Sequence, residues 1–327
     1  TASQLLFASG GVLASTRQAR AQIAGALADY DGARQQLLLD VASAYAGVRQ
    51  AQEIVAARQT TVSNLTELQR YAGAQFDAGL VTRTDVAQAD ARLAQAQTQL
   101  VQAQGQLAAA NEAYMRLVGH PPNALAAPGD VEGVPASLQD ALDLAVRQNP
   151  FLISTLAAAR AADAALAVAR SDNFPTVSLQ ASSSLGGELN NSSSETSQDS
   201  IGVRMSWSLF NGGLSLSRVR QQRALRSAAN LDVAAAERSV HEDVTNAWTG
   251  LMSARAALAS AQQQVQASEI AYRGVRLEHE TGLRSTIDVL NQEQDLLDAR
   301  LAQAQAERDL VVAERQMLAV TGSLTPQ

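Results

Sequence analysis

Two short stretches share the same turn chemistry and carry the side chains best suited to a polar contact. The first, AGLVTRTDV, spans residues 78–86, and the second, TGLRSTIDV, spans residues 281–289. Each has a Gly-Leu pair, a short polar segment and then Asp-Val at the start of an Ala- and Gln-rich run. Because arginine and carboxylate side chains form charge-assisted hydrogen bonds, each turn is a candidate site for such links. The Gly-Leu pairs are Gly79-Leu80 and Gly282-Leu283.

A purely structural role also explains these turns. Gly79 and Gly282 are expected to end one helix with a positive φ. Thr84 lies near the start of the next helix, and Asp85 and Asp288 fall in a first turn, where the helix dipole favours an acid. A functional role therefore has to be argued from where the turns lie in the fold.

The rest of the chain offers no catalytic constellation. His120, His241 and His279 share no metal-ligand spacing, and the chain has no cysteine. No GxSxG, P-loop or helix-entering GxGxxG motif is present. We expect neither an enzyme nor a metal or cofactor site. The net charge of −7 and the pI of about 5.1 argue against nucleic-acid binding, which needs a basic surface.

The chain aligns with itself, without a gap, at a shift of 203 residues. The match extends from the Phe7/Phe210 pair to the Gly119/Gly322 pair and includes both turns. It predicts two repeats, at residues 1–124 and 211–327. Linker and lead-in helices are expected at 125–174 and a β-hairpin at 175–210.

Each repeat is expected to be a long helical hairpin. Hydrophobic residues make up 46% of the chain and aromatic residues only 4%, which favours closely packed Ala-rich helices over a globular core. Neither repeat has a proline before the end of its second helix, so no proline kinks a long helix. Long helices of roughly 100 Å are expected, at 12–77 and 213–278. Tip turns follow at 78–83 and 279–285, and shorter helices at 84–118 and 286–321.

The shorter helices carry a heptad pattern. In the first, large and small apolar residues alternate at steps of three and four from Val86 to Leu117, which is typical of a coiled-coil seam. The second has the same seam, interrupted by Gln292 and Gln303. An ordinary soluble coiled coil therefore remains an alternative at this point.

Alternating residues before the second repeat predict strands. In SIGVRMSWSL, residues 200–209, apolar side chains alternate with polar or small ones, and PTVSLQASSS, residues 175–184, behaves in the same way. Strands of about ten residues with one apolar face have the length and pattern of membrane β-barrel strands, and Trp207 and Phe210 fit an aromatic girdle. A soluble hairpin resting on the helices is the alternative. GGELNNSSSETSQDS is expected to be the polar loop between the two strands.

Residues 1–7 match the end of the second strand under the repeat shift. They are expected to be the end of a strand whose hairpin partner precedes the sequence, together with a lead-in helix. No run of about 20 apolar residues was found, so no transmembrane helix is expected.

The chain resembles the TolC family of outer-membrane efflux and secretion proteins over essentially its whole length. The resemblance is carried by SWSLFNGG, by the segment from Leu138 to Leu179, and by the paired turns AGLVTRTDV and TGLRSTIDVLNQEQDLLDARLAQAQAERD. The second turn is more similar to the type I secretion and general efflux branch than to the lipidated drug-efflux branch.

This resemblance implies a mainly α protein with a small β part, assembled as a homotrimer in the cell outer membrane and extending into the periplasm. Each protomer would give four strands to a 12-stranded barrel in outer-membrane lipid. Its helical hairpins would build an α-barrel tunnel for exporting small molecules or proteins. The implied partners are a periplasmic adaptor protein and an inner-membrane transporter.

The resemblance also implies a gate at the periplasmic tips, where neighbouring helices are linked. Carried over, one link runs from Arg284 to Thr84 and Asp85. The family has a tyrosine that pairs with this aspartate, and here that position is His279. A His279–Asp85 pair would close more firmly below about pH 6.5.

An acidic ring at the constriction carries over to Asp288. Its companion acid one turn later is Asn291 here, so a second ring is not expected. Three carboxylates, one from each protomer, would favour cations.

Two other classes of protein remain open from the sequence. A periplasmic adaptor also carries a long helical hairpin, but soluble β domains should flank it, and the order of elements here differs. A purely structural coiled coil would leave the alternating hairpin unexplained.

Overall fold

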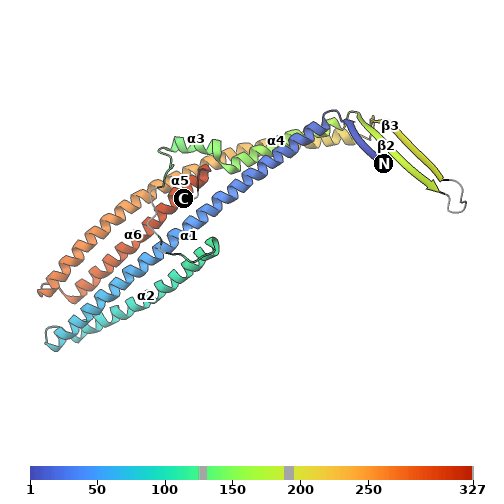
Figure 1. Ribbon diagram of the computed structural model, residues 1–327. Helices are drawn as coiled ribbons and strands as arrows, with labels where there is room; N and C mark the ends of the chain where they lie inside the picture. The colour runs from blue at the N-terminus through green and yellow to red at the C-terminus, as the bar shows by residue number, and fades with distance from the viewer. Residues whose placement is uncertain (124, 126–130, 188–194, 326–327) are drawn as a thin grey trace. The chain divides into compact units, whose positions relative to one another are not determined.

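The computed structural model describes residues 1–123, 125, 131–187 and 195–325. The elements in chain order are β1 (Ala2–Phe7), α1 (Gly11–Asp77), α2 (Arg83–Val118), α3 (Leu138–Gln148), α4 (Pro150–Ser171), β2 (Thr176–Gly187), β3 (Glu195–Ser206), α5 (Leu214–Glu280) and α6 (Thr286–Thr321) (Figure 1). The mainly helical architecture with a small β part agrees with the sequence-based expectation.

The tandem duplication is visible in the lengths of the helices. Helices α1 and α5 have 67 residues each, and α2 and α6 have 36 each. Every helix boundary in the second repeat lies 203 residues after its counterpart in the first. Helix α5 continues two residues beyond the expected 278, because no helix-terminating glycine occurs before Gly282, so His279 lies in its last turn.

The chain divides into two compact units, each assembled from two stretches. Unit 1 comprises residues 1–32 and 146–241, and unit 2 comprises residues 33–145 and 242–327. Unit 2 contains both tip turns, with α2 beside the C-terminal part of α1 and α6 beside the C-terminal part of α5 (Figure 1). The units are described separately below.

Unit 2 is held together by small clusters where helices of both repeats meet. Leu65 of α1, Ala96 of α2 and Leu290 of α6 form one cluster, and Leu39, Leu318 and Leu324 form another. On α2 the buried residues are alanines of the expected seam and Tyr114. Small side chains allow close helix packing, which explains why so few large apolar residues are needed.

Unit 1 packs α4 against the start of α1 at glycine positions. A Cβ on Gly25 would lie 3.6 Å from Ala157, and one on Gly11 would lie 2.7 Å from Ser171 Oγ. The second contact is shorter than real Cβ contacts, so only glycine fits there without a shift. Ser154 Oγ donates to Asp29 at 2.5 Å across the same interface.

Unit 1 also contains a three-stranded antiparallel sheet in the order β1-β2-β3. Its apolar cross-strand pairs are Val177–Met205, Leu179–Val203 and Ala181–Ile201, while Ser178 faces Arg204 and Ser182 faces Ser200. β3 has 12 residues, Glu195–Ser206, so it begins inside the expected polar loop and ends before Trp207 and Leu209, which were expected to belong to it. Part of the expected polar loop, residues 188–194, lies outside the described residues.

Helix α4 differs from the expectation that no helix could span a membrane. Pro150–Ser171 has the length and mean hydropathy, 1.5, of a spanning helix. Its apolar content is largely alanine, which a search for continuous large apolar residues underweights. A single such helix is weak support for a membrane span, and α4 buries Leu152, Ala157 and Leu166 within unit 1.

Candidate functional site at the helical tips

The first tip turn is closed by a reciprocal cap at the start of α2. Thr82 is the N-cap, and its backbone N and Oγ1 both donate to Asp85 Oδ2, at 2.9 and 2.7 Å. These hydrogen bonds, first from the Thr82 side chain and then from its backbone, lower the pKa of Asp85. Asp85 is thus held ionised at the tip, while Thr84 is exposed and makes no part of this cap.

The second tip turn repeats this arrangement at the start of α6. The backbone N and Oγ of Ser285 donate to Asp288 Oδ2 at 3.1 and 2.7 Å. The Ser285 hydrogen bonds are the main cause of the lowered pKa of Asp288. Gly79 and Gly282 have φ of 74° and 78°, so the expected glycine helix endings are present. Leu80 and Leu283 are exposed beside them.

Arg284 is paired within its own hairpin. Its Nε lies 2.8 Å from Glu278 Oε2, and this contact is the main cause of its raised pKa. Within one chain, the structure does not bring Arg284 together with Thr84 or Asp85. The expected link stays a prediction about contacts between neighbouring protomers.

His279 is buried at the end of α5 and is only 5% exposed. Its Nδ1 lies 2.9 Å from the carbonyl oxygen of Arg284, an arrangement in which Nδ1 donates. Its ring meets Tyr71 of α1 edge-on, with centroids 5.6 Å apart. Among the described residues Nε2 has no hydrogen-bond partner, and the chain itself does not place His279 on Asp85.

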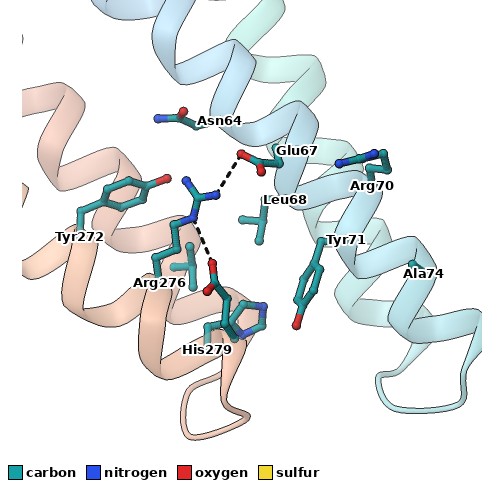
Figure 2. Close-up of a pocket in the computed structure, with 11 residues that line it drawn as sticks. Asn64, Glu67, Leu68, Arg70, Tyr71, Ala74, Tyr272, Arg276 and His279 are labelled. Atoms are coloured by element: carbon teal, nitrogen blue, oxygen red, sulfur yellow. Dashed lines mark ion pairs between the residues drawn. The ribbon is translucent and has the colours of Figure 1, made fainter.

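A cleft of about 370 Å³ lies beside His279, between α1 and α5. Arg276 occupies it and joins the two repeats, since its guanidinium lies 3.1 Å from Glu67 and 3.4 Å from Glu280 (Figure 2). Figure 2 also shows Tyr272 beside Arg276 and Tyr71 facing His279.

Sequence reasoning missed this cross-link. The Arg276/Glu280 spacing of four residues signals a pair on one helix, but nothing in the sequence indicates that Glu67 lies opposite. The repeat shift places Gly73 at the position of Arg276 and Ile270 at that of Glu67. Gly73 and Ile270 cannot form an ion pair, so the cross-link has no counterpart at the equivalent positions of the two repeats.

The described residues include no group of three or more His, Asp or Glu side chains that could hold a metal ion. The chemistry of this region is instead that of reversible association. Exposed ion pairs contribute only about 0.2–1 kcal/mol each, so several weak links together would hold two hairpins in contact and still allow them to part.

The chain thus combines paired helical hairpins with a sheet whose apolar side chains are exposed. The chain belongs to the outer membrane efflux protein family, whose pattern matches residues 1–120 and 141–323.

Individual relatives agree with this assignment. The chain is 31% identical to the outer membrane efflux protein BepC of Brucella suis, over 89% of this chain and 64% of that protein. It is 29% identical to the alkaline protease secretion protein AprF of Pseudomonas aeruginosa, over 85% and 60% of the two chains. Its fold is similar to the outer-membrane channel OprN, with a TM-score of 0.83, 25% identity, and coverage of 98% of this chain and 74% of that one.

The resemblance drawn from the paired turns is thus confirmed, and the family assignment places the protein in the outer membrane. The chain spans somewhat less than two thirds of the length of the curated relatives BepC and AprF, 64% and 60%.

Proposed function

We propose that this chain is the protomer of a homotrimeric outer-membrane conduit that exports small molecules or proteins and is closed at its periplasmic tip. A periplasmic adaptor and an inner-membrane transporter supply the cargo and the energy. The observation that carries the proposal is the match of residues 1–120 and 141–323 to the outer membrane efflux protein family. The Arg276–Glu67 ion pair supplies a breakable link between the two hairpins.

The sheet supports the membrane end of this proposal. Ile201, Val203 and Met205 are 76%, 67% and 61% exposed, although they form one continuous apolar face with their partners on β2. Such a face is stable in contact with lipid, and backbone groups at its edges are satisfied only when the sheet closes into a barrel. Strands from three protomers would form that 12-stranded barrel.

The tips support the periplasmic end. Each protomer carries an ionised Asp85 and an ionised Asp288 in first helical turns, and Arg284 lies near Asp288. With three protomers around one axis, Arg284 can exchange Glu278 for Thr84 and Asp85 of a neighbouring hairpin. Three Asp288 carboxylates would form an acidic ring that favours cations at the entrance.

The exposed tip leucines suit an adaptor. Leu80 and Leu283 are 73% and 77% exposed at pseudo-equivalent positions. An apolar side chain beside a polar rim is typical of a protein contact surface. We assign these two turns to the adaptor contact.

Single-channel conductance in a planar bilayer tests the gate. Arg284→Ala and Asp85→Ala are expected to raise the conductance above that of the unsubstituted protein, because each removes one partner of the closing link. Arg273→Ala is the control, since Arg273 is exposed on α5 and its Nε bonds only the carbonyl of Glu269. Unchanged low conductance in both tip variants would contradict the gate assignment.

A further inference from the structure

One acidic residue near the tips is buried, although burying a carboxylate costs free energy. Glu293 of α6 is 2% exposed, whereas Asp295 and Asp298 on the same helix are exposed. A buried carboxylate is stable only when hydrogen bonds or charges compensate it. The partners of Glu293 therefore show what its position does.

Those partners come from two other helices. Asn64 of α1 donates through Nδ2 to both carboxylate oxygens, at 3.1 and 3.2 Å. Tyr272 of α5 lines the same cleft as Asn64 and lies close enough for the charge of Glu293 to add to the effect of burial in raising the pKa of its hydroxyl group. None of the ion pairs found within the described ranges includes Glu293. One carboxylate thus joins α1, α5 and α6, which belong to both repeats.

The first repeat shows what is special about this arrangement. The repeat shift places Asp90 at the position of Glu293 and Gln69 at that of Tyr272. Gln69 Nε2 donates to Asp90 Oδ1 at 2.9 Å. A polar contact between the two helices of a hairpin is therefore found at the same place in both repeats. Asp90, however, is exposed, and the counterpart of Asn64 is Ala267, which has no donor. Only in the second repeat does the carboxylate also accept hydrogen bonds from the other repeat, through Asn64.

The junction continues to the ion pair at the tip cleft. Burial, and next the charge of Glu293, raise the pKa of Tyr272, so the phenol stays protonated and can donate to the carboxylate. Arg276 lies beside Tyr272 in the tip cleft (Figure 2). Arg276 then reaches Glu67 on α1. The result is a continuous polar chain from Glu293 through Tyr272 and Arg276 to Glu67.

We propose that Glu293 is a positioning residue for tip closure: its buried carboxylate fixes Tyr272, which in turn orients Arg276 toward Glu67. This inference rests on the proposed function. Because Glu293 is only 2% exposed, it acts through the side chains that it holds. It sets the geometry in which α1 of the first repeat is held against α5 and α6 of the second.

The test uses single-channel conductance of the full trimer in a planar bilayer. Glu293→Gln keeps the size of the side chain and removes its charge, and Tyr272→Phe removes only the hydroxyl. Each is expected to raise the conductance severalfold, as Arg276→Gln should. Asp90→Asn is the matched control, because it removes the pseudo-equivalent exposed carboxylate, and it should leave the conductance unchanged.

Combined variants separate positioning from a general structural role. In an Arg276→Gln background, Glu293→Gln should have no further effect on conductance, because residues acting in one chain are not additive. An equally large additional rise in that background would overturn the proposal. So would wild-type conductance in both Glu293→Gln and Tyr272→Phe while Arg284→Ala still opens the channel. If no variant, Arg284→Ala included, changes the conductance, the gate assignment fails instead.

Discussion

At the scale of single residues, the two tip turns cap their helices in the same way but differ in other side chains. Asp85 and Asp288 both cap a helix and both have a lowered pKa. His279, in contrast, stands where the first repeat has Phe76, so only the second repeat has an imidazole at the end of its long helix.

Glu53 leads to a prediction about how the stability of the protein depends on pH. Burial, and next the charge of Glu307, raise its pKa, and the Arg49 ion pair at 2.9 Å only partly opposes this. A raised pKa in the folded state means that the neutral form is favoured there. Glu53 therefore makes its full contribution to stability at pH values below its pKa in the unfolded chain. This contribution is lost as the pH rises through its pKa in the folded protein.

Glu53→Gln should consequently stabilise the protein at pH 7. The gain should be less than about 1 kcal/mol, because the side chain is partly exposed, and it should vanish at about pH 4. Thermal unfolding at both pH values measures it. Asp40→Asn serves as the control, since Asp40 is exposed and bonded only to Gln36 of its own helix. A stabilising effect that is the same at both pH values would contradict the assignment.

At the scale of elements, the sheet and the helices place different demands on their exposed faces. Polar residues are exposed along the long helices, whereas β3 exposes Ile201, Val203 and Met205. The register with β2 places these three on one face and Arg204 on the other. A single β-strand thus has one face suited to lipid and one suited to water.

Substitutions on β3 should reveal this division. Val203→Arg should cost up to about 2–4 kcal/mol of membrane stability, as expected for arginine on the lipid face near the bilayer midplane. Ser200→Arg, on the polar face, should cost little. The measurement is the folded fraction in lipid vesicles during urea titration. Equal losses in the two variants would mean that neither face is in lipid.

The element scale also shows what could be predicted from sequence. Heptad spacing, missing prolines and the 203-residue shift predict every long helix within two residues of its observed end. The wider buried surface of α6 was missed, because Glu293, Leu290 and Leu297 lie off the expected seam and are buried by contact with other helices. Periodicity within one helix cannot show which distant helix will lie against it.

The candidate site was predictable to a smaller degree. The capping acids and the glycine helix endings follow from local chemistry, and the structure has them. Arg276–Glu67 joins residues far apart in sequence, and its counterparts in the repeat are Gly73 and Ile270. Links between protomers involve a surface that one chain does not contain, so the Arg284–Thr84 contact stays a prediction.

At the scale of the whole molecule, the apolar surface of unit 1 is too large for a protomer that stays alone in water. Ile23, Leu27 and Tyr30 of α1 are each more than 60% exposed, at one helical face. Contiguous exposed apolar residues mark a contact surface. A protomer with this surface is expected to associate.

We therefore expect the protein to fractionate with the outer membrane and to migrate as a trimer that dissociates on heating. Detergent extraction followed by electrophoresis with and without boiling measures both properties. A periplasmic adaptor would be recovered in a soluble or inner-membrane fraction. A structural coiled coil would be released without detergent, unlike a membrane protein. Recovery of a monomer at every temperature would contradict the assembly.

The equal lengths of the helices limit how this protein can change. Because α1 and α5 both have 67 residues, the two hairpins of a protomer have matching arms. Losing one heptad from α1 alone would shorten that arm by about 10 Å and separate Glu67 from Arg276 in register. We therefore expect insertions and deletions in the long helices to be tolerated only as matched pairs, one in each repeat, so that the length of the hairpins is one property encoded at two places in the gene.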